Sequence, residues 1–245
     1  MENEILVGLL LFIVAFFYSS VGHGGASGYL AVLGVLGYNI TALRFSALIL
    51  NVLVSSVSFL NFFRKKFFDL RLFLYLSAGS IPMAFLGAKI SVDTVWYFRI
   101  LALCLILAAW RLSGIFIPDH SSEKTRRFPI WIFIFLGAFI GFISGLIGIG
   151  GGIILSPILI LLRVTDTKTC SGIAALFVWV NSVAGIIGGY QTTFVISSLQ
   201  PIWLVSAVAG GFMGAYWGSS LARPVLLRRI LAGVLLIASV KMIIV

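Results

Sequence analysis

Two glycine clusters that interrupt long hydrophobic runs constrain the fold of this sequence more than any other feature. The first cluster comprises Gly22, Gly24 and Gly25, and the second is the stretch 148–152, Gly-Ile-Gly-Gly-Gly. Each glycine costs a helix roughly 1 kcal/mol relative to alanine, so both clusters are predicted to break a helix. In lipid, a broken helix is tolerated only where its freed backbone is buried in protein or lines a cavity. A break that recurs in both halves of a membrane chain therefore indicates a binding site near the bilayer midplane.

The composition places these breaks in a membrane. The chain has 245 residues, of which 61% are hydrophobic and only 10% charged, with a mean hydropathy of +1.17. Soluble domains are about 45–50% apolar and about 25% charged. The sequence predicts an all-α, multi-pass membrane protein that contacts the lipid bilayer. The net charge of +10 comes from basic residues between apolar runs, which favours a positive-inside membrane topology over nucleic-acid binding.

The sequence contains an internal duplication. A shift of about 126 positions places the first glycine cluster on the second, Thr41 on Thr167, and Ser55–Ser56 on Asn181–Ser182. We therefore divide the chain into a first repeat (1–112), a cytoplasmic linker (113–127) and a second repeat (128–245). The apolar pieces after the clusters, 26–38 and 152–162, are short for a hydrocarbon core about 30 Å thick. Each is expected to be a re-entrant half-helix or a short helix prolonged by its flanks, giving about 8–10 helical elements in all.

Loop charges predict that the two repeats are inverted. The loop 64–71 carries four basic residues, whereas its counterpart in the second repeat, 191–200, carries none. Conversely, 223–229 is basic and its counterpart near 91–94 is not. By the positive-inside rule, equivalent loops lie on opposite faces, with the linker inside and both termini outside. Parallel repeats with four crossings each stay open as the alternative.

The predicted site lacks fixed charge and favours an anion. All seven acidic residues lie at the amino terminus or in polar connections, and none lies within an apolar run. Each glycine break is instead followed by the amino end of a helix, where free N–H groups and the helix dipole attract anions. Hydroxyl and amide side chains nearby could complete the shell. The predicted substrate-binding residues are Gly22, His23, Gly24, Gly25, Ser27, Asn51, Ser55, Gly148, Gly150, Gly151, Gly152, Asn181 and Ser182, with Ser56 as a further neighbour.

Several of these residues have a structural alternative. The glycines could serve close helix packing, and Asn51 and Asn181 could hydrogen-bond between helices without touching a ligand. His23 could be a structural hydrogen-bonding residue, contact the substrate, or carry a coupled proton near neutral pH. Arg44, near the start of a predicted span, is expected to anchor its charge at the membrane surface.

The second cluster, followed by Pro157, resembles the glycine-rich element of the TauE/SafE family of sulfite exporters, and the first cluster resembles a weaker copy. The resemblance covers essentially the whole chain. It implies movement, outward in direction, of sulfite or small organosulfonates across a bacterial inner membrane, with the substrate-binding role on the glycines of both clusters. The first copy departs from the pattern, because His23 lies inside it, Ala26 replaces the third glycine, and Ala31 stands in place of the proline.

Three function classes remain to be compared. A secondary anion transporter fits inverted, broken-helix repeats best, and a passive anion channel or a carrier of another small sulfur or carboxylate anion is the alternative. An enzyme is not expected, because no nucleophile and base are paired in the apolar segments. The sequence predicts no catalytic residue, no metal site and no cofactor, and no nucleic-acid partner; a homodimer stays open.

Overall fold

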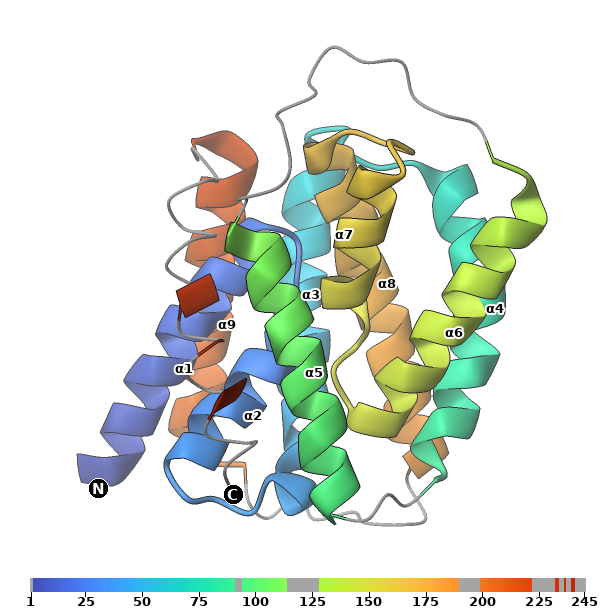
Figure 1. Cartoon of the computed structure of the whole chain (residues 1–245). Helices are drawn as coiled ribbons and strands as arrows, with labels where there is room; N and C mark the ends of the chain where they lie inside the picture. The colour runs from blue at the N-terminus through green and yellow to red at the C-terminus, as the bar shows by residue number, and fades with distance from the viewer. Residues whose placement is uncertain are drawn as a thin grey trace.

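The described residues form a bundle of helices, some running up and others down the bundle (Figure 1). The computed structural model describes residues 2–90, 94–113, 128–189 and 199–221, together with a few single positions between 232 and 240. The helices are α1 (Glu2–Ser20), α2 (Ala26–Val35), α3 (Ile40–Arg64), α4 (Leu70–Ala88), α5 (Thr94–Ser113), α6 (Ile130–Ile147), α7 (Gly152–Leu161), α8 (Thr167–Gly189) and α9 (Pro201–Ser220). No strand occurs in these ranges.

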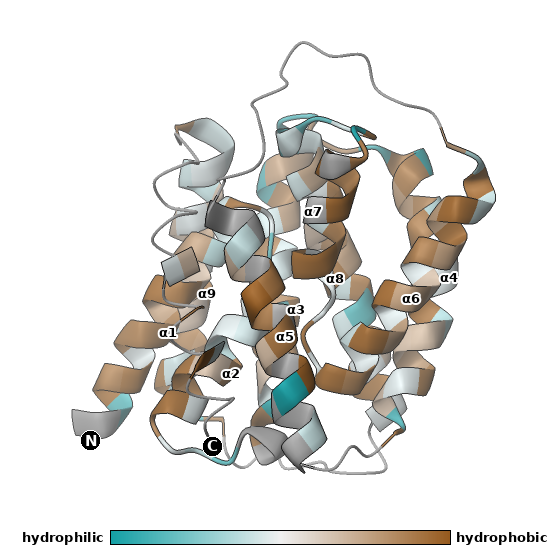
Figure 2. Ribbon diagram, in the orientation of Figure 1, coloured by the Kyte–Doolittle hydropathy of each residue, from teal (hydrophilic) through white to brown (hydrophobic). Residues whose placement is uncertain are grey.

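Hydrophobic residues cover most of each helix, and hydrophilic residues gather at the two ends of the bundle (Figure 2). Among the described residues, α3, α4, α6 and α8 are long and apolar enough to cross a membrane. Two described helices begin at an aspartate whose carboxylate accepts backbone N–H groups of the first turn: Asp69 at α4 and Asp166 at α8. The prediction of a multi-pass, all-α membrane fold is confirmed.

The first helix of each half is broken as predicted. Between α1 and α2 lies the segment 21–25, here called break 1, and between α6 and α7 lies the segment 148–151, here called break 2. The short helices α2 and α7 have ten residues each, or about 15 Å, which is about half of a hydrocarbon core. They are therefore half-helices that begin inside the bundle.

Equivalent helices of the two halves run in opposite directions. In Figure 1, α1 rises and α2 descends, whereas α6 descends and α7 rises; α3 rises and α8 descends. The inverted arrangement predicted from loop charge is therefore present in the fold, and the parallel alternative is wrong. The linker from 114 onward, the loop 190–198 and most of the chain after 221 lie outside the described residues, so the predicted repeat boundaries stay a prediction.

The tightest helix pairs join the two halves. Helix α4 packs against α6, and α1 packs against α9. A stripe of glycines on α6 (Gly137, Gly141, Gly145) meets the backbone of α4, and a stripe on α9 (Gly210, Gly214, Gly218) meets the backbone of α1. A Cβ at any of these six positions would overlap a backbone carbonyl of the partner helix. Small residues spaced in this way let membrane helices approach at backbone distance.

Candidate functional site

Both breaks depend on glycine because their backbone enters the left-handed region. In break 1, Gly22 has φ +79° and Gly25 has φ +103°; in break 2, Gly148, Gly150 and Gly151 have φ between +74° and +81°. Residues with a Cβ rarely adopt this region, whereas glycine does so at little cost. Gly25 and Gly151 each stand directly before a half-helix and turn the chain into it.

The two breaks meet at one side chain, Asn51, in the middle of α3. Asn51 is 0% exposed. Its Oδ1 accepts the Ala26 N–H, the first amide of α2, at 3.0 Å. Its Nδ2 donates to Ser182 Oγ of α8 at 2.9 Å and to the Ile149 carbonyl of break 2 at 3.5 Å. Asn51 therefore links α2, α8 and break 2.

Contact with Asn51 also explains why glycine is required at two of the predicted positions. A Cβ on Gly24 would overlap Asn51 Oδ1, and a Cβ on Gly150 would overlap Asn51 Nδ2 and lie 3.0 Å from Ser182 Oγ. The backbones of the two breaks thus pack against opposite sides of one carboxamide. Gly24 and Gly150 are required for this close approach, in addition to the φ requirement at Gly150.

His23 crosses from break 1 to the half-helix α7. It is 7% exposed, and its Nε2 shares a hydrogen bond with Ser156 Oγ of α7 at 3.1 Å. Its ring stands edge-on to the ring of Tyr18, with 6.5 Å between centroids. A Cβ on Gly152 would lie 2.9 Å from His23 Cδ2, so the imidazole packs against the first residue of α7. His23 therefore contacts the amino end of the opposite half-helix.

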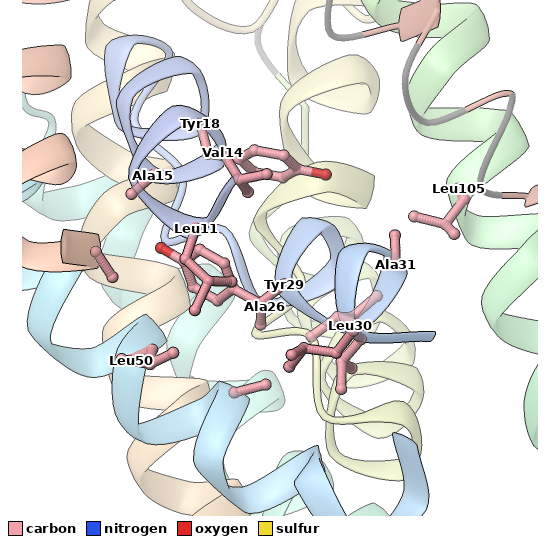
Figure 3. Packing of buried hydrophobic residues seen from close by; sticks show 14 of the residues in the cluster. Leu11, Val14, Ala15, Tyr18, Ala26, Tyr29, Leu30, Ala31, Leu50 and Leu105 are labelled. Atoms are coloured by element: carbon pink, nitrogen blue, oxygen red, sulfur yellow. The ribbon is translucent and has the colours of Figure 1, made fainter. Parts of the chain in front are cut away.

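Two buried tyrosines support break 1, and sequence reasoning did not identify them. Tyr18 OH shares a hydrogen bond with Ser27 Oγ at 3.0 Å, and Tyr29 OH donates to the Gly24 carbonyl at 2.8 Å. Both tyrosines lie in the core that α1 and α2 form with Leu50 of α3 (Figure 3). A tyrosine inside an apolar run needs a partner for its hydroxyl, and this was the signal available in the sequence.

The remaining predicted residues divide into two groups. Ser182 joins the Asn51 contact. Ser55 and Asn181 are buried, but their hydrogen bonds go to carbonyls of their own helices, from Ser55 Oγ to Val52 and from Asn181 Nδ2 to Phe177. Ser56 likewise donates to the Val52 carbonyl.

Arg44 of α3 packs against break 2. Its side chain hydrogen-bonds to helix ends, whereas the sequence predicted a charge that extends to the membrane surface. It is half-buried, and its two terminal nitrogens donate to the carbonyls of Leu146 in α6 and Ala88 in α4, at 2.9 and 3.1 Å. Its aliphatic stem lies where a Cβ on Gly148 would be. Arg44 thus satisfies the carbonyl ends of two helices beside the start of break 2.

The charge around the breaks comes from backbone dipoles. The acidic residues of the described chain, Glu2, Glu4, Asp69 and Asp166, lie at the ends of the bundle. Helices α2 and α7 begin at the breaks, so the positive ends of both dipoles are buried beside them. In the described residues, no group of His, Cys, Asp and Glu side chains could hold a metal ion. Such a site attracts an anion and offers it N–H and hydroxyl donors.

A cavity of about 320 Å³ opens elsewhere, where α1 begins and α2 ends. Its lining residues are Leu6, Val7, Leu36, Gly37 and Tyr38. Asn51, His23 and the two tyrosines pack beside the breaks.

Comparison with known proteins gives the family. The model of the family described as sulfite exporter TauE/SafE matches residues 7–242. The chain is also similar to the probable membrane transporter protein y4hK of Sinorhizobium fredii (strain NBRC 101917 / NGR234), with 28% identity over 245 residues that cover 99% of each chain. No solved structure matches the chain. The broken, inverted helices and the match over nearly its whole length place the chain in the sulfite exporter TauE/SafE family of membrane transporters.

Proposed function

We propose that this transporter moves a small sulfur-containing anion, sulfite or an organosulfonate, outward across the membrane. The observation that carries the proposal is that Asn51 joins the amino end of α2 to break 2, which leads into the amino end of α7, while the acidic side chains of the described residues lie at the ends of the bundle. The family description, which names sulfite export, agrees with this electrostatic preference. The amides of the first turn are the proposed ligands, at Ser27 and Gly28 in α2 and at Gly152 and Ile153 in α7.

The glycines of both breaks shape this site. Because the breaks are glycine, their backbone can lie against Asn51 and His23 without steric overlap. His23, Ser27 and Ser182 supply the nearest polar side chains. The protein has no ATP-binding loop in its sequence, so the proposed energy source is an ion gradient or the gradient of the anion itself.

Flux measurements in proteoliposomes test this function. We expect saturable sulfite flux that organosulfonates inhibit, and we expect Gly24→Leu and Gly150→Leu to abolish it while the protein still inserts. Gly37→Leu is the matched control, because Gly37 also has a positive φ, +83°, but nothing lies within 4 Å of its Cβ position. Absence of saturable flux for both anion classes would refute the substrate assignment. Unchanged flux in Gly150→Leu would refute the location of the site.

A passive anion channel is the second candidate, and the same backbone amides would serve it. The two differ in kinetics. A channel would give flux that does not saturate and does not respond to an imposed proton gradient, whereas a coupled transporter would respond to the gradient.

A further inference from the structure

The carboxamide of Asn51 has a fixed orientation that connects both breaks. An asparagine side chain has one acceptor oxygen and one donor NH₂ group. In this structure the oxygen faces Ala26 N–H, and the NH₂ group faces Ser182 Oγ and the Ile149 carbonyl. A flipped carboxamide would place donor against donor at Ala26 and acceptor against acceptor at Ile149, so the orientation follows from the partners.

Asn51 Oδ1 takes the position that an anion oxygen would take at α2. Ala26 N–H is the first amide of this half-helix, and such an amide has no partner within its own helix. It also lies at the positive end of the helix dipole. The Ala26 N–H therefore donates to the neutral amide oxygen of Asn51, although its position at the helix dipole favours a negatively charged oxygen.

The amino end of α7 differs from that of α2. The shift that superimposes the two halves places Phe177 at the position of Asn51, and Phe177 Cε1 lies 3.1 Å from the Cβ position of Gly151. Phenylalanine offers no acceptor. Ser144 also packs against this residue, with its Cβ 3.2 Å from the Cβ position of Gly151. Ser144 is 1% exposed, and its Oγ has no hydrogen-bond partner within the described part of the chain.

A buried hydroxyl without a partner is unfavourable, and a ligand that accepts its hydrogen bond offsets this cost. Ser144 is therefore an observation, independent of Asn51, that points to a ligand with acceptor oxygens at the breaks. One half-helix end is held by an internal acceptor, and the other end has a buried donor available.

Resting on the function proposed above, we infer that Asn51 is a built-in competitor of the transported anion. The anion binds at α2 by replacing Asn51 Oδ1 on Ala26 N–H. When the carboxamide turns away, its NH₂ group leaves the Ile149 carbonyl and Ser182 Oγ, and the contact between break 1 and break 2 opens. Anion binding at one break thereby changes the packing of the other.

The strength of the competing bonds supports this exchange. A hydrogen bond to a charged acceptor is roughly twice as strong as one between neutral groups. A sulfite or sulfonate oxygen can therefore displace a neutral amide oxygen. Because Asn51 is neutral, the competition is reversible, whereas a carboxylate at this position would hold the α2 amide with its own charge.

The affinity of the Asn51→Ala variant for sulfite shows whether Asn51 competes with the anion or binds it. Removing a competitor frees the Ala26 amide, so we expect the apparent Kd for sulfite, measured by titration of the purified protein, to fall by about tenfold, which corresponds to one hydrogen bond. A weaker affinity would show that Asn51 is a direct ligand, and an unchanged affinity would show a purely structural role. Either result overturns the inference.

Asn51→Asp provides a second variant of the same size. We expect it to lose sulfite and methanesulfonate binding while its melting temperature stays within a few degrees of the wild type. If Asn51→Asp binds either anion with the affinity of the wild type, the inference is overturned. This test holds even when Asn51→Ala does not fold. Asn61→Ala is the matched control, because Asn61 lies on the same helix and donates to the Val57 carbonyl, away from both breaks.

The same titrations separate this inference from the proposed function. If the wild-type protein binds neither sulfite nor methanesulfonate, both the proposed substrate class and the competitor role are wrong. If the wild type binds them and Asn51→Ala does not bind more tightly, only the competitor role is wrong.

Discussion

At the scale of single residues, one imidazole connects break 1 to the opposite half-helix. His23 shares a hydrogen bond with Ser156 and packs against Gly152 at the start of α7. The ring of Tyr18 stands edge-on to this imidazole. A proton on His23 would therefore change the charge beside the α7 amino end and the hydrogen bond that reaches it.

We expect His23→Ala to flatten the pH dependence of transport. Imidazole is the side chain that can gain a proton near neutral pH, so the wild-type rate should depend on pH. A protonated His23 adds positive charge beside the proposed anion site, so the wild-type rate of anion binding should be higher on the acid side. Initial flux rates in proteoliposomes at matched pH on both sides give the profile. His120→Ala, at the other histidine of the chain, should keep the wild-type profile, and a pH profile of His23→Ala identical to wild type would remove His23 from the mechanism.

The residues of the two breaks could be predicted from the sequence, whereas most side chains that hydrogen-bond to the breaks could not. Glycines at 22–25 and 148–152 stood out because glycine is unfavourable in a helix and they recur at a fixed spacing. Asn51 and Ser182 were also selected, as polar residues in apolar runs. Whether Asn51 faces a ligand or a backbone amide depends on which helix packs against it, and periodicity does not contain that information. Ser156 and Tyr29 were missed for the same reason.

At the scale of helices, Arg44 joins the ends of two helices to a third. From the first turns of α3 it donates to the last turns of α6 and α4. The sequence predicted only a charge anchored at the surface, because long basic side chains near helix ends usually extend toward the headgroups. Here the free carbonyls of two helix ends lie within reach, and a planar guanidinium can satisfy both.

We expect Arg44→Met to lower the free energy of unfolding by about 1–3 kcal/mol, because two carbonyls lose a charged donor. Arg44→Lys should recover only part of this loss, since an ammonium group lacks the planar pair of donors. Thermal unfolding in detergent measures the effect. Lys89→Met is the control at the same end of the bundle, because Lys89 is exposed and stacks on the Phe85 ring. Equal melting temperatures for Arg44→Met and the wild type would contradict this role.

At the scale of the whole molecule, basic residues are unequally divided between the two ends of the bundle. The end with the α3–α4 and α7–α8 connections holds Arg64, Lys65, Lys66, Arg71, Arg163 and Lys168 (Figure 1). Among the described residues, the other end holds Arg44, Lys89 and Arg99. The first end should therefore face the cytoplasm.

Cysteine labelling tests this orientation. In a chain whose Cys104 and Cys170 are replaced by alanine, we expect Lys89→Cys to react with a membrane-impermeant maleimide in right-side-out vesicles, and Lys66→Cys to react only in inverted vesicles. Both positions are exposed and lie at opposite ends of the bundle. The reverse pattern would show that the protein is inserted the other way.

The glycine stripes have a consequence for biosynthesis. Helix α1 lies along α9, and Ser19 Oγ donates to the Gly211 carbonyl, 192 positions further along the chain. During synthesis α1 enters the bilayer long before its partner exists, and α4 must likewise wait for α6. Each half therefore completes its packing only on the other, so a ribosome that stops after the linker leaves a product with two unmatched helix faces. We expect membrane proteases to degrade such a fragment faster than a chain in which α6 and α9 are present.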